Sequence, residues 1–128
     1  MRYRGSESYF GKIDIYNSLI EKYETIYQYV DGKSSYEARL IIKLWRPGVA
    51  NNEYIIIETI NLINHSLIYD SKKDYTVLYN DVIIDEDENL LTIRLLGEYD
   101  DAENNMMRIV CHDFEYRYVL SDRELAEW

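Results

Sequence analysis

The sequence predicts one α+β domain spanning residues 1–128. We expect an N-terminal amphipathic helix packed on a mostly antiparallel meander sheet of about five strands, followed by a short C-terminal helix. Three observations carry this prediction: helical spacing of apolar residues over 14–30, strand-like alternation over 36–45 and 107–120, and a hairpin pattern over 75–96. A chain of 128 residues with 47% hydrophobic content is long and apolar enough to form one core.

The first predicted element is a helix from Asp14 to Val30. Its apolar stripe consists of Tyr16, Leu19, Ile20, Tyr23, Ile26, Tyr27 and Val30. Asp14 suits the N-cap, and Gly32 stands where a helix end favours a left-handed residue. The stripe covers barely two heptads, so a helix lying on a sheet is expected rather than a coiled coil.

The next stretch, Tyr36 to Trp45, alternates between apolar and polar side chains and predicts a strand. Ser34 followed by Glu37 has the spacing of a capping box, so a helix over 35–46 is the alternative.

A turn at Arg46-Pro47-Gly48 leads to a second β-branched run, 53–60, which also predicts a strand. The spacing of Ile56, Ile60, Ile63 and Leu67 leaves a helix over 56–68 as the alternative.

The stretch from Tyr75 to Leu96 has the pattern of a β-hairpin. Short β-branched and aromatic runs flank a polar tip of four consecutive acids, 85–88, followed by Asn89. This acidic tip is the first candidate for a functional surface.

A long alternating strand is predicted from Met107 to Leu120. The face assigned to the core carries Val110, His112, Phe114, Tyr116, Tyr118 and Leu120, and the other face carries Cys111, Asp113, Glu115 and Arg117. Ser121 and Glu124 form a capping box that opens a short helix through Trp128.

Charge is distributed unevenly along the chain, whose net charge is −10. Residues 1–50 hold eight Lys and Arg against six Asp and Glu, whereas residues 51–128 hold six against 18. Nine acids and only Arg94 as a base fall within 81–103. Binding of DNA or RNA through phosphates requires Lys and Arg, so the acidic half argues against direct nucleic-acid binding.

No catalytic, cofactor or metal site is predicted. An EF-hand loop starting at Asp85 would need Gly and Glu where Leu90 and Leu96 stand. One cysteine and two histidines cannot build a structural zinc site, and Cys111 and His112 point to opposite faces of a strand. Gly-rich phosphate loops and nucleophile elbows are absent from the sequence.

The leading functional hypothesis is a small, non-enzymatic protein that blocks a basic partner. Nuclease inhibitors and immunity proteins, including those of phage or mobile-element type, place carboxylates where the partner binds nucleic-acid phosphates. The predicted partner-binding residues are Asp85, Glu86, Asp87, Glu88, Glu98, Asp100, Asp101 and Glu103.

Two alternatives come from other classes. One is a small ligand-binding or catalytic domain with a Tyr-lined pocket near His112. The other is a homo-oligomeric structural protein, for which a homodimer is the simplest form.

The single cysteine, the polar start of the chain and the lack of a long apolar run predict a cytoplasmic protein without a signal peptide or a membrane span.

Overall fold

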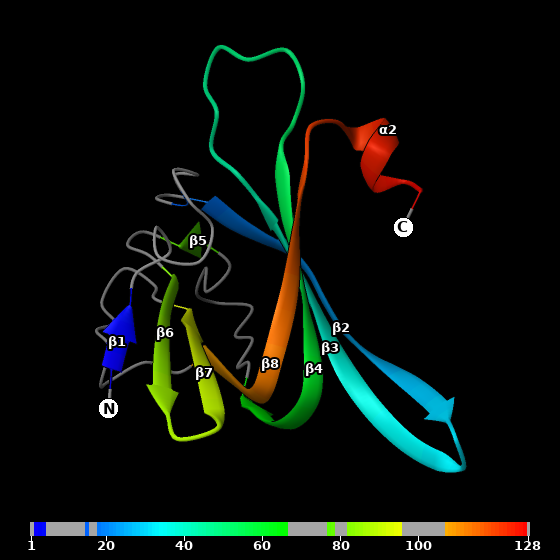
Figure 1. Ribbon diagram of the computed structural model, residues 1–128. Helices are drawn as coiled ribbons and strands as arrows, with labels where there is room; N and C mark the ends of the chain where they lie inside the picture. The colour runs from blue at the N-terminus through cyan, green and yellow to red at the C-terminus, as the bar shows by residue number, and fades with distance from the viewer. Residues whose placement is uncertain are drawn as a thin grey trace.

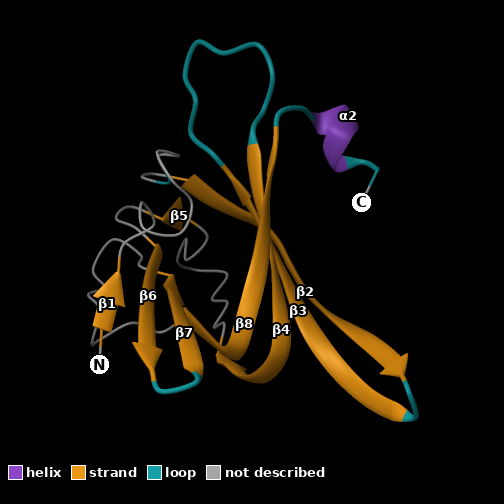
Figure 2. Ribbon diagram, viewed as in Figure 1, coloured by secondary structure: helices purple, strands orange, loops and turns teal. Residues whose placement is uncertain are grey.

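The protein is described by a computed structural model, which covers residues 2–4, 15, 18–66, 77–78, 82–95 and 107–127. These residues form one antiparallel sheet of eight strands and a single turn of helix (Figures 1 and 2). The elements are β1 (Arg2–Arg4), β2 (Ser18–Val30), β3 (Lys33–Lys43), β4 (Tyr54–Ser66), β5 (Val77–Leu78), β6 (Val82–Asp87), β7 (Leu90–Leu95), β8 (Met107–Val119) and α2 (Asp122–Leu125).

The sheet joins two three-stranded meanders, β2-β3-β4 and β6-β7-β8. The strand order is β1-β6-β7-β8-β4-β3-β2-β5, so the meanders meet where β8 pairs with β4. Each meander begins with a hairpin closed by a two-residue turn, at 31–32 and at 88–89.

One strongly curved face of the sheet holds the main core. Its buried residues are Ile15, Leu40, Ile42, Leu44, Ile55, Ile57, Val82, Ile84, Ile93, Leu95, Ile109 and Cys111. Side chains from β6 and β7 share this cluster with those from β3 and β4, which the sheet brings together by curving. A smaller cluster on the opposite face contains Ile41, Tyr54, Ile56 and Val119, and Leu125 of α2 packs against it.

The prediction of an α+β fold with an N-terminal helix over 14–30 is wrong. The described part of this segment is the 13-residue strand β2. A β-bulge between Ile20 and Lys22 shifts the register, so Ile20 and Tyr23 both pack against the core although they are three residues apart. That spacing imitates a helical stripe.

The residues at the end of β2 form a hairpin turn rather than a helix end. Asp31 and Gly32 have φ values of 53° and 77°. Positive φ at both central residues is the geometry of a type I′ turn, which Asp-Gly favours. A glycine in the left-handed conformation is also common at a helix C-terminus, so Gly32 was consistent with the predicted helix end as well.

Three predicted strands are present. Residues 36–45 correspond to β3 and 53–60 to β4, so the helical alternatives over 35–46 and over the described residues 56–66 are wrong. Residues 107–120 correspond to β8.

The hairpin predicted over 75–96 is formed by β6 and β7. The part before it, β5, pairs with β2 instead.

The predicted C-terminal helix is present as the four-residue α2. The side chain of Ser121 accepts a hydrogen bond from the backbone N–H of Glu124 at 3.1 Å, as the capping box requires. Glu124 in turn accepts from the N–H of Leu120 at 3.2 Å.

The core face assigned to β8 is wrong along most of the strand. Cys111 is fully buried and His112 is exposed, the reverse of the prediction. The paired strand β4 has Asn61 at a φ of 58° and a register shift between Leu62 and Asn64, so the alternation does not continue through this region. Farther along, Phe114 packs against the main core as predicted. In the second half Tyr116, Tyr118 and Leu120 are exposed, and Val119 is buried instead.

No helix among the described residues has the length and apolar character that a membrane crossing requires.

Candidate functional site

The β6–β7 hairpin carries the acidic stretch 85–88, but most of this stretch is strand rather than turn. The ladder runs from the Val82–Leu95 pair to the Asp87–Leu90 pair. Only Glu88 and Asn89 form the connection, with Glu88 at a φ of 55°. Alternation along β6 therefore sends neighbouring acids to opposite faces.

Asp85 is only 3% exposed, although it lies on the face of β6 opposite to the core residue Ile84. Its Oδ2 lies 3.1 Å from a guanidinium nitrogen of Arg94, which stands diagonally across the ladder on β7. A buried carboxylate bound to an arginine offers no surface to a partner, so Asp85 does not belong to the candidate surface.

The next acid, Glu86, is half-buried and takes part in the ladder with β1. The register places it opposite Arg2. Asp87 and Glu88 are both exposed. The exposed acids at this end of the hairpin are therefore Asp87 and Glu88.

An open groove of about 560 Å³ lies between the β6–β7 turn and β8. Its lining is Glu86, Glu88, Asn89, Leu91, His112 and Asp113. His112 Nδ1 lies 3.1 Å from the carbonyl oxygen of Asn89, which ties β8 to the turn. The groove is thus lined by three carboxylates and one exposed imidazole.

The acids Glu98, Asp100, Asp101 and Glu103 lie outside the described residues. We therefore define the acidic surface by Asp87, Glu88 and Asp113, with Glu86 at its margin.

The remaining candidate groups do not assemble into reactive chemistry in the described part of the chain. Burial raises the pKa of the Cys111 thiol to about 12, which disfavours the nucleophilic thiolate at neutral pH. No group of three or more His, Cys, Asp or Glu side chains able to hold a metal ion occurs among the residues that the structure covers.

Comparison with protein-family models, with curated proteins and with solved structures finds no match for this chain. The function is therefore inferred from the chain's own residues.

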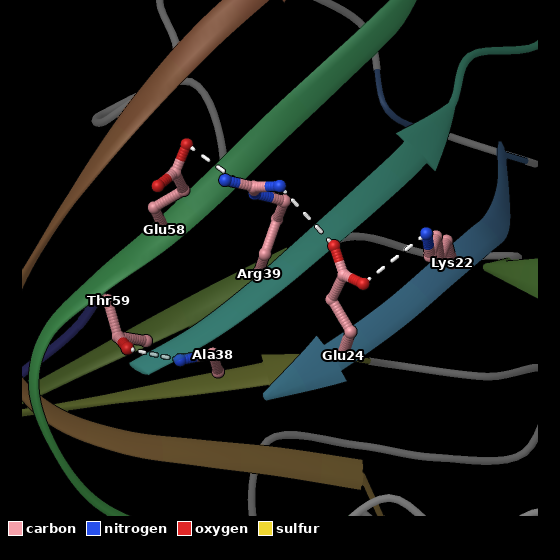
Figure 3. Close-up of polar contacts among 6 residues, drawn as sticks. All are labelled: Lys22, Glu24, Ala38, Arg39, Glu58 and Thr59. Carbon is pink, nitrogen blue, oxygen red and sulfur yellow. Dashed lines mark hydrogen bonds and ion pairs between the residues drawn. The ribbon is translucent and has the colours of Figure 1, made fainter. Parts of the chain in front are cut away.

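The sequence interpretation missed a second polar site, where β3 and β4 separate. Arg39 on β3 lies between Glu24 of β2 and Glu58 of β4, at 3.4 and 3.7 Å, and Lys22 lies 3.3 Å from Glu24 (Figure 3). At the point of separation, the N–H of Ala38 donates to Thr59 Oγ1 at 2.8 Å (Figure 3).

Glu37 completes this polar site. Its carboxylate accepts from the Thr59 hydroxyl at 2.8 Å and from the backbone N–H of Asn61 at 3.0 Å. We call Glu37, Ala38, Thr59 and Asn61 the clamp. The signal in the sequence was Glu58-Thr59, a polar pair that interrupts the apolar run 54–60.

Beyond the clamp lies a second open groove of about 530 Å³. Residues of the β2–β3 hairpin line one side and residues of β4 and β8 line the other. Its charged lining residues are Lys33, Glu37, Glu58 and Glu115. Glu58 and Glu115 stand directly opposite each other in the β4–β8 ladder, an unfavourable arrangement of like charges.

Proposed function

We propose that this chain is a small acidic binding protein that covers a basic surface of a nucleic-acid-binding protein or nuclease and thereby blocks it. The observation that supports this proposal is the acidic surface formed by Asp87, Glu88 and Asp113. Glu88 in the β6–β7 turn and Asp113 of β8 line the same groove, and Asp87, the last residue of β6, is exposed next to Glu88.

Among the described residues, no Lys or Arg forms an ion pair with Asp87, Glu88 or Asp113. Arg94 is the one base within 81–103, and its guanidinium is directed to the buried Asp85. Exposed carboxylates attract a positively charged partner over roughly 8 Å at physiological ionic strength. We expect their main effect on the association rate, which should fall as salt is added.

The proposal assigns no catalytic role and no cofactor to the chain. The alternative of a Tyr-lined pocket near His112 gains no support, because the groove beside His112 has no tyrosine among its described lining residues. The single cysteine favours a reducing compartment, so we place the proposed activity in the cytoplasm.

The test is affinity capture from host lysate at low and high salt, followed by kinetic measurement on the captured protein. The site variant is Asp87→Lys with Glu88→Lys. The matched control, Glu21→Lys with Glu127→Lys, changes the net charge equally at two other exposed positions.

We expect the wild type and the control to retain a basic nucleic-acid-binding protein at low salt and to inhibit it. The site variant should associate at least roughly tenfold more slowly. Equal association rates for the site variant and the wild type at low salt would exclude this acidic surface as the binding site.

A further inference from the structure

The sheet forks at the clamp, and the fork leaves one edge of β3 open. β3 pairs with β2 along its whole length, from the Val30–Lys33 pair to the Leu19–Lys43 pair. It pairs with β4 only between Arg39 and Lys43. Beyond this point the β2–β3 hairpin extends away from β4 and β8 (Figure 2). We call its residues 26–37 the arm.

On the open edge, the backbone groups of Ser34 and Tyr36 point away from β2. The N–H of Ala38 is directed to β4, where Thr59 Oγ1 accepts it. Hydrogen-bonding direction alternates along a strand, so Tyr36 and Ser34 direct their N–H and C=O groups to the same side as Ala38. Among the described residues, no strand pairs with the edge at these two positions.

Along this edge Ser34 and Ser35 are small, polar and exposed, Lys33 and Tyr36 are larger and exposed, and Glu37 is half-buried. The sequence of the edge is Lys33-Ser34-Ser35-Tyr36-Glu37. Ser34 and Ser35 leave the backbone accessible, and a basic residue stands at one end with an acidic residue at the other. An antiparallel copy of this segment brings each Lys opposite a Glu.

We propose that two copies of this chain pair through their β3 edges, antiparallel and centred on Ser35, to form a homodimer with a continuous sheet. In this register Ser34 stands opposite Tyr36 of the second copy, and each such pair exchanges two backbone hydrogen bonds. Lys33 stands opposite Glu37 of the second copy. The outward direction of the Ser34 and Tyr36 backbone groups and the charges of Lys33 and Glu37 favour the same register.

The second copy also supplies a positive charge to the groove beyond the clamp. Its Lys33 enters a groove whose carboxylates, Glu37, Glu58 and Glu115, outnumber its one basic lining residue. A cation there relieves the repulsion between Glu58 and Glu115.

The arm exposes aromatic area that a dimer covers. Tyr27 and Tyr36 are 55% and 59% exposed and contact each other edge-on, with ring centroids 5.3 Å apart. Tyr36 and Ser34 share one face of β3, so the pairing places Tyr36 of each copy beside the aromatic pair of the other.

The outer edge of β2 is less suited to self-pairing. Its charged residues Lys22 and Glu24 already form an ion pair within one chain, at 3.3 Å. The dimer interface on β3 uses no residue of the acidic surface on β6–β7 and β8. The dimer can therefore be tested independently of the proposed inhibition.

A disulfide test examines the register directly. In a non-hydrogen-bonded antiparallel pair the Cα atoms are about 4.5 Å apart, which a disulfide can bridge. Ser35→Cys should therefore form a covalent dimer under mild oxidation, while the buried Cys111 stays reduced. The matched control is Gln28→Cys, which stands opposite Ser35 on β2 and is also exposed. It should remain monomeric on a denaturing gel.

A second test measures the mass of the full chain by sedimentation equilibrium over a range of concentrations. We expect reversible dimerisation for the wild type. Ser34→Pro removes only an N–H that points outward, which an edge strand tolerates, and it should weaken the dimer roughly tenfold or more. The control Ser34→Thr should dimerise like the wild type.

Charge exchange gives a third test. Lys33→Glu alone and Glu37→Lys alone bring like charges together in each homodimer, so both should be monomeric. An equimolar mixture should form a heterodimer, because both cross-strand pairs are then opposite in charge. Circular dichroism of each variant checks that the loss of Glu37 from the clamp has not unfolded it.

A monomeric mass at every concentration would overturn the proposal, as would a dimer that Ser34→Pro leaves unchanged. Failure of Ser35→Cys to cross-link, or protection of the Ser34 and Tyr36 amides by a Lys-rich peptide but not by a second copy, would overturn it as well. The latter result would assign the edge to another protein's strand.

Discussion

The hydroxyl of Thr59 lies 2.8 Å from the carboxylate of Glu37 and links two strands at the point where their backbone pairing ends. The same hydroxyl accepts the N–H of Ala38. Thr59 is buried, so its side chain rather than water accepts the hydrogen bond from the Ala38 N–H, which is directed to β4. The fork in the sheet is thus a defined structural feature.

Thr59→Val tests the clamp. The variant keeps the shape of the side chain but leaves the Ala38 N–H and one Glu37 oxygen without this partner. We expect a loss of about 1–3 kcal/mol in the free energy of unfolding, measured by urea denaturation. The control Thr25→Val, at an exposed position opposite Ala38 on β2, should change stability by less than about 0.5 kcal/mol. Equal stability of both variants would show that the clamp contributes nothing.

Arg94→Met tests the buried pair in the acidic hairpin. Removing the guanidinium leaves the Asp85 carboxylate, 3% exposed, as an uncompensated buried charge. The free energy of unfolding should fall by about 3–5 kcal/mol. Arg39→Met breaks ion pairs that are nearer the solvent and should cost about 1 kcal/mol or less. Adding Asp85→Leu to Arg94→Met should restore much of the lost stability, which a purely steric effect would not explain.

Tyr54→Phe should change the titration of Asp122. The Tyr54 hydroxyl, 2.5 Å away, and the Asn52 amide lower the pKa of Asp122 below its usual range. The native state therefore favours the carboxylate, and this stabilisation is present above the unfolded pKa of about 3.9 and lost as pH falls through the lower native value. In the variant the midpoint, followed by carboxyl NMR shifts, should rise toward about 3.9. An unchanged midpoint would contradict the assignment.

The same contact affects alkaline stability. Burial and the neighbouring Asp122 raise the pKa of Tyr54 to about 12. The neutral phenol is favoured in the native state, so its contribution is present below pH about 10 and declines as pH rises toward 12. Wild-type protein should lose more stability than Tyr54→Phe over this range in urea titrations at increasing pH.

Labelling of Cys111 by a thiol reagent should report unfolding of the whole sheet. The side chain is fully buried, and its pKa of about 12 keeps it protonated at neutral pH. The labelling rate should be negligible in the native state and should rise with urea in parallel with the loss of sheet. Ser35→Cys, at an exposed position, provides a fast-labelling reference under reducing preparation. Rapid labelling of native Cys111 would show that β8 opens locally.

The parts of the fold that the sequence predicted correctly are those in which one face of a strand is buried. Alternation in β3 is clear because Ala38, Leu40 and Ile42 are all buried. The helix was wrongly predicted over the β2 part of the arm because both faces of the arm are accessible to solvent. Burial therefore does not impose an alternating apolar pattern there. Tyr27 and Val30 are exposed although they belonged to the predicted helical stripe.

The candidate site was predicted only in part, for a related reason. A run of four acids carries no periodic signal, so the sequence gives no indication that Asp85 is buried whereas Asp87, on the same face of β6, is exposed. That distinction depends on the ladder register with β7, which places Arg94 within reach of Asp85. The pairing of β8 with β7, which brings His112 and Asp113 beside the turn, is a long-range contact that local patterns do not encode.

The two-residue turn at Asp31 and Gly32 has a further consequence for how the chain can change over time. Each strand of the arm could become longer or shorter by two residues at a time. The side chains of β2 and β3 outside the arm would then keep their orientation. The length of the arm could therefore change during evolution without any change in the core.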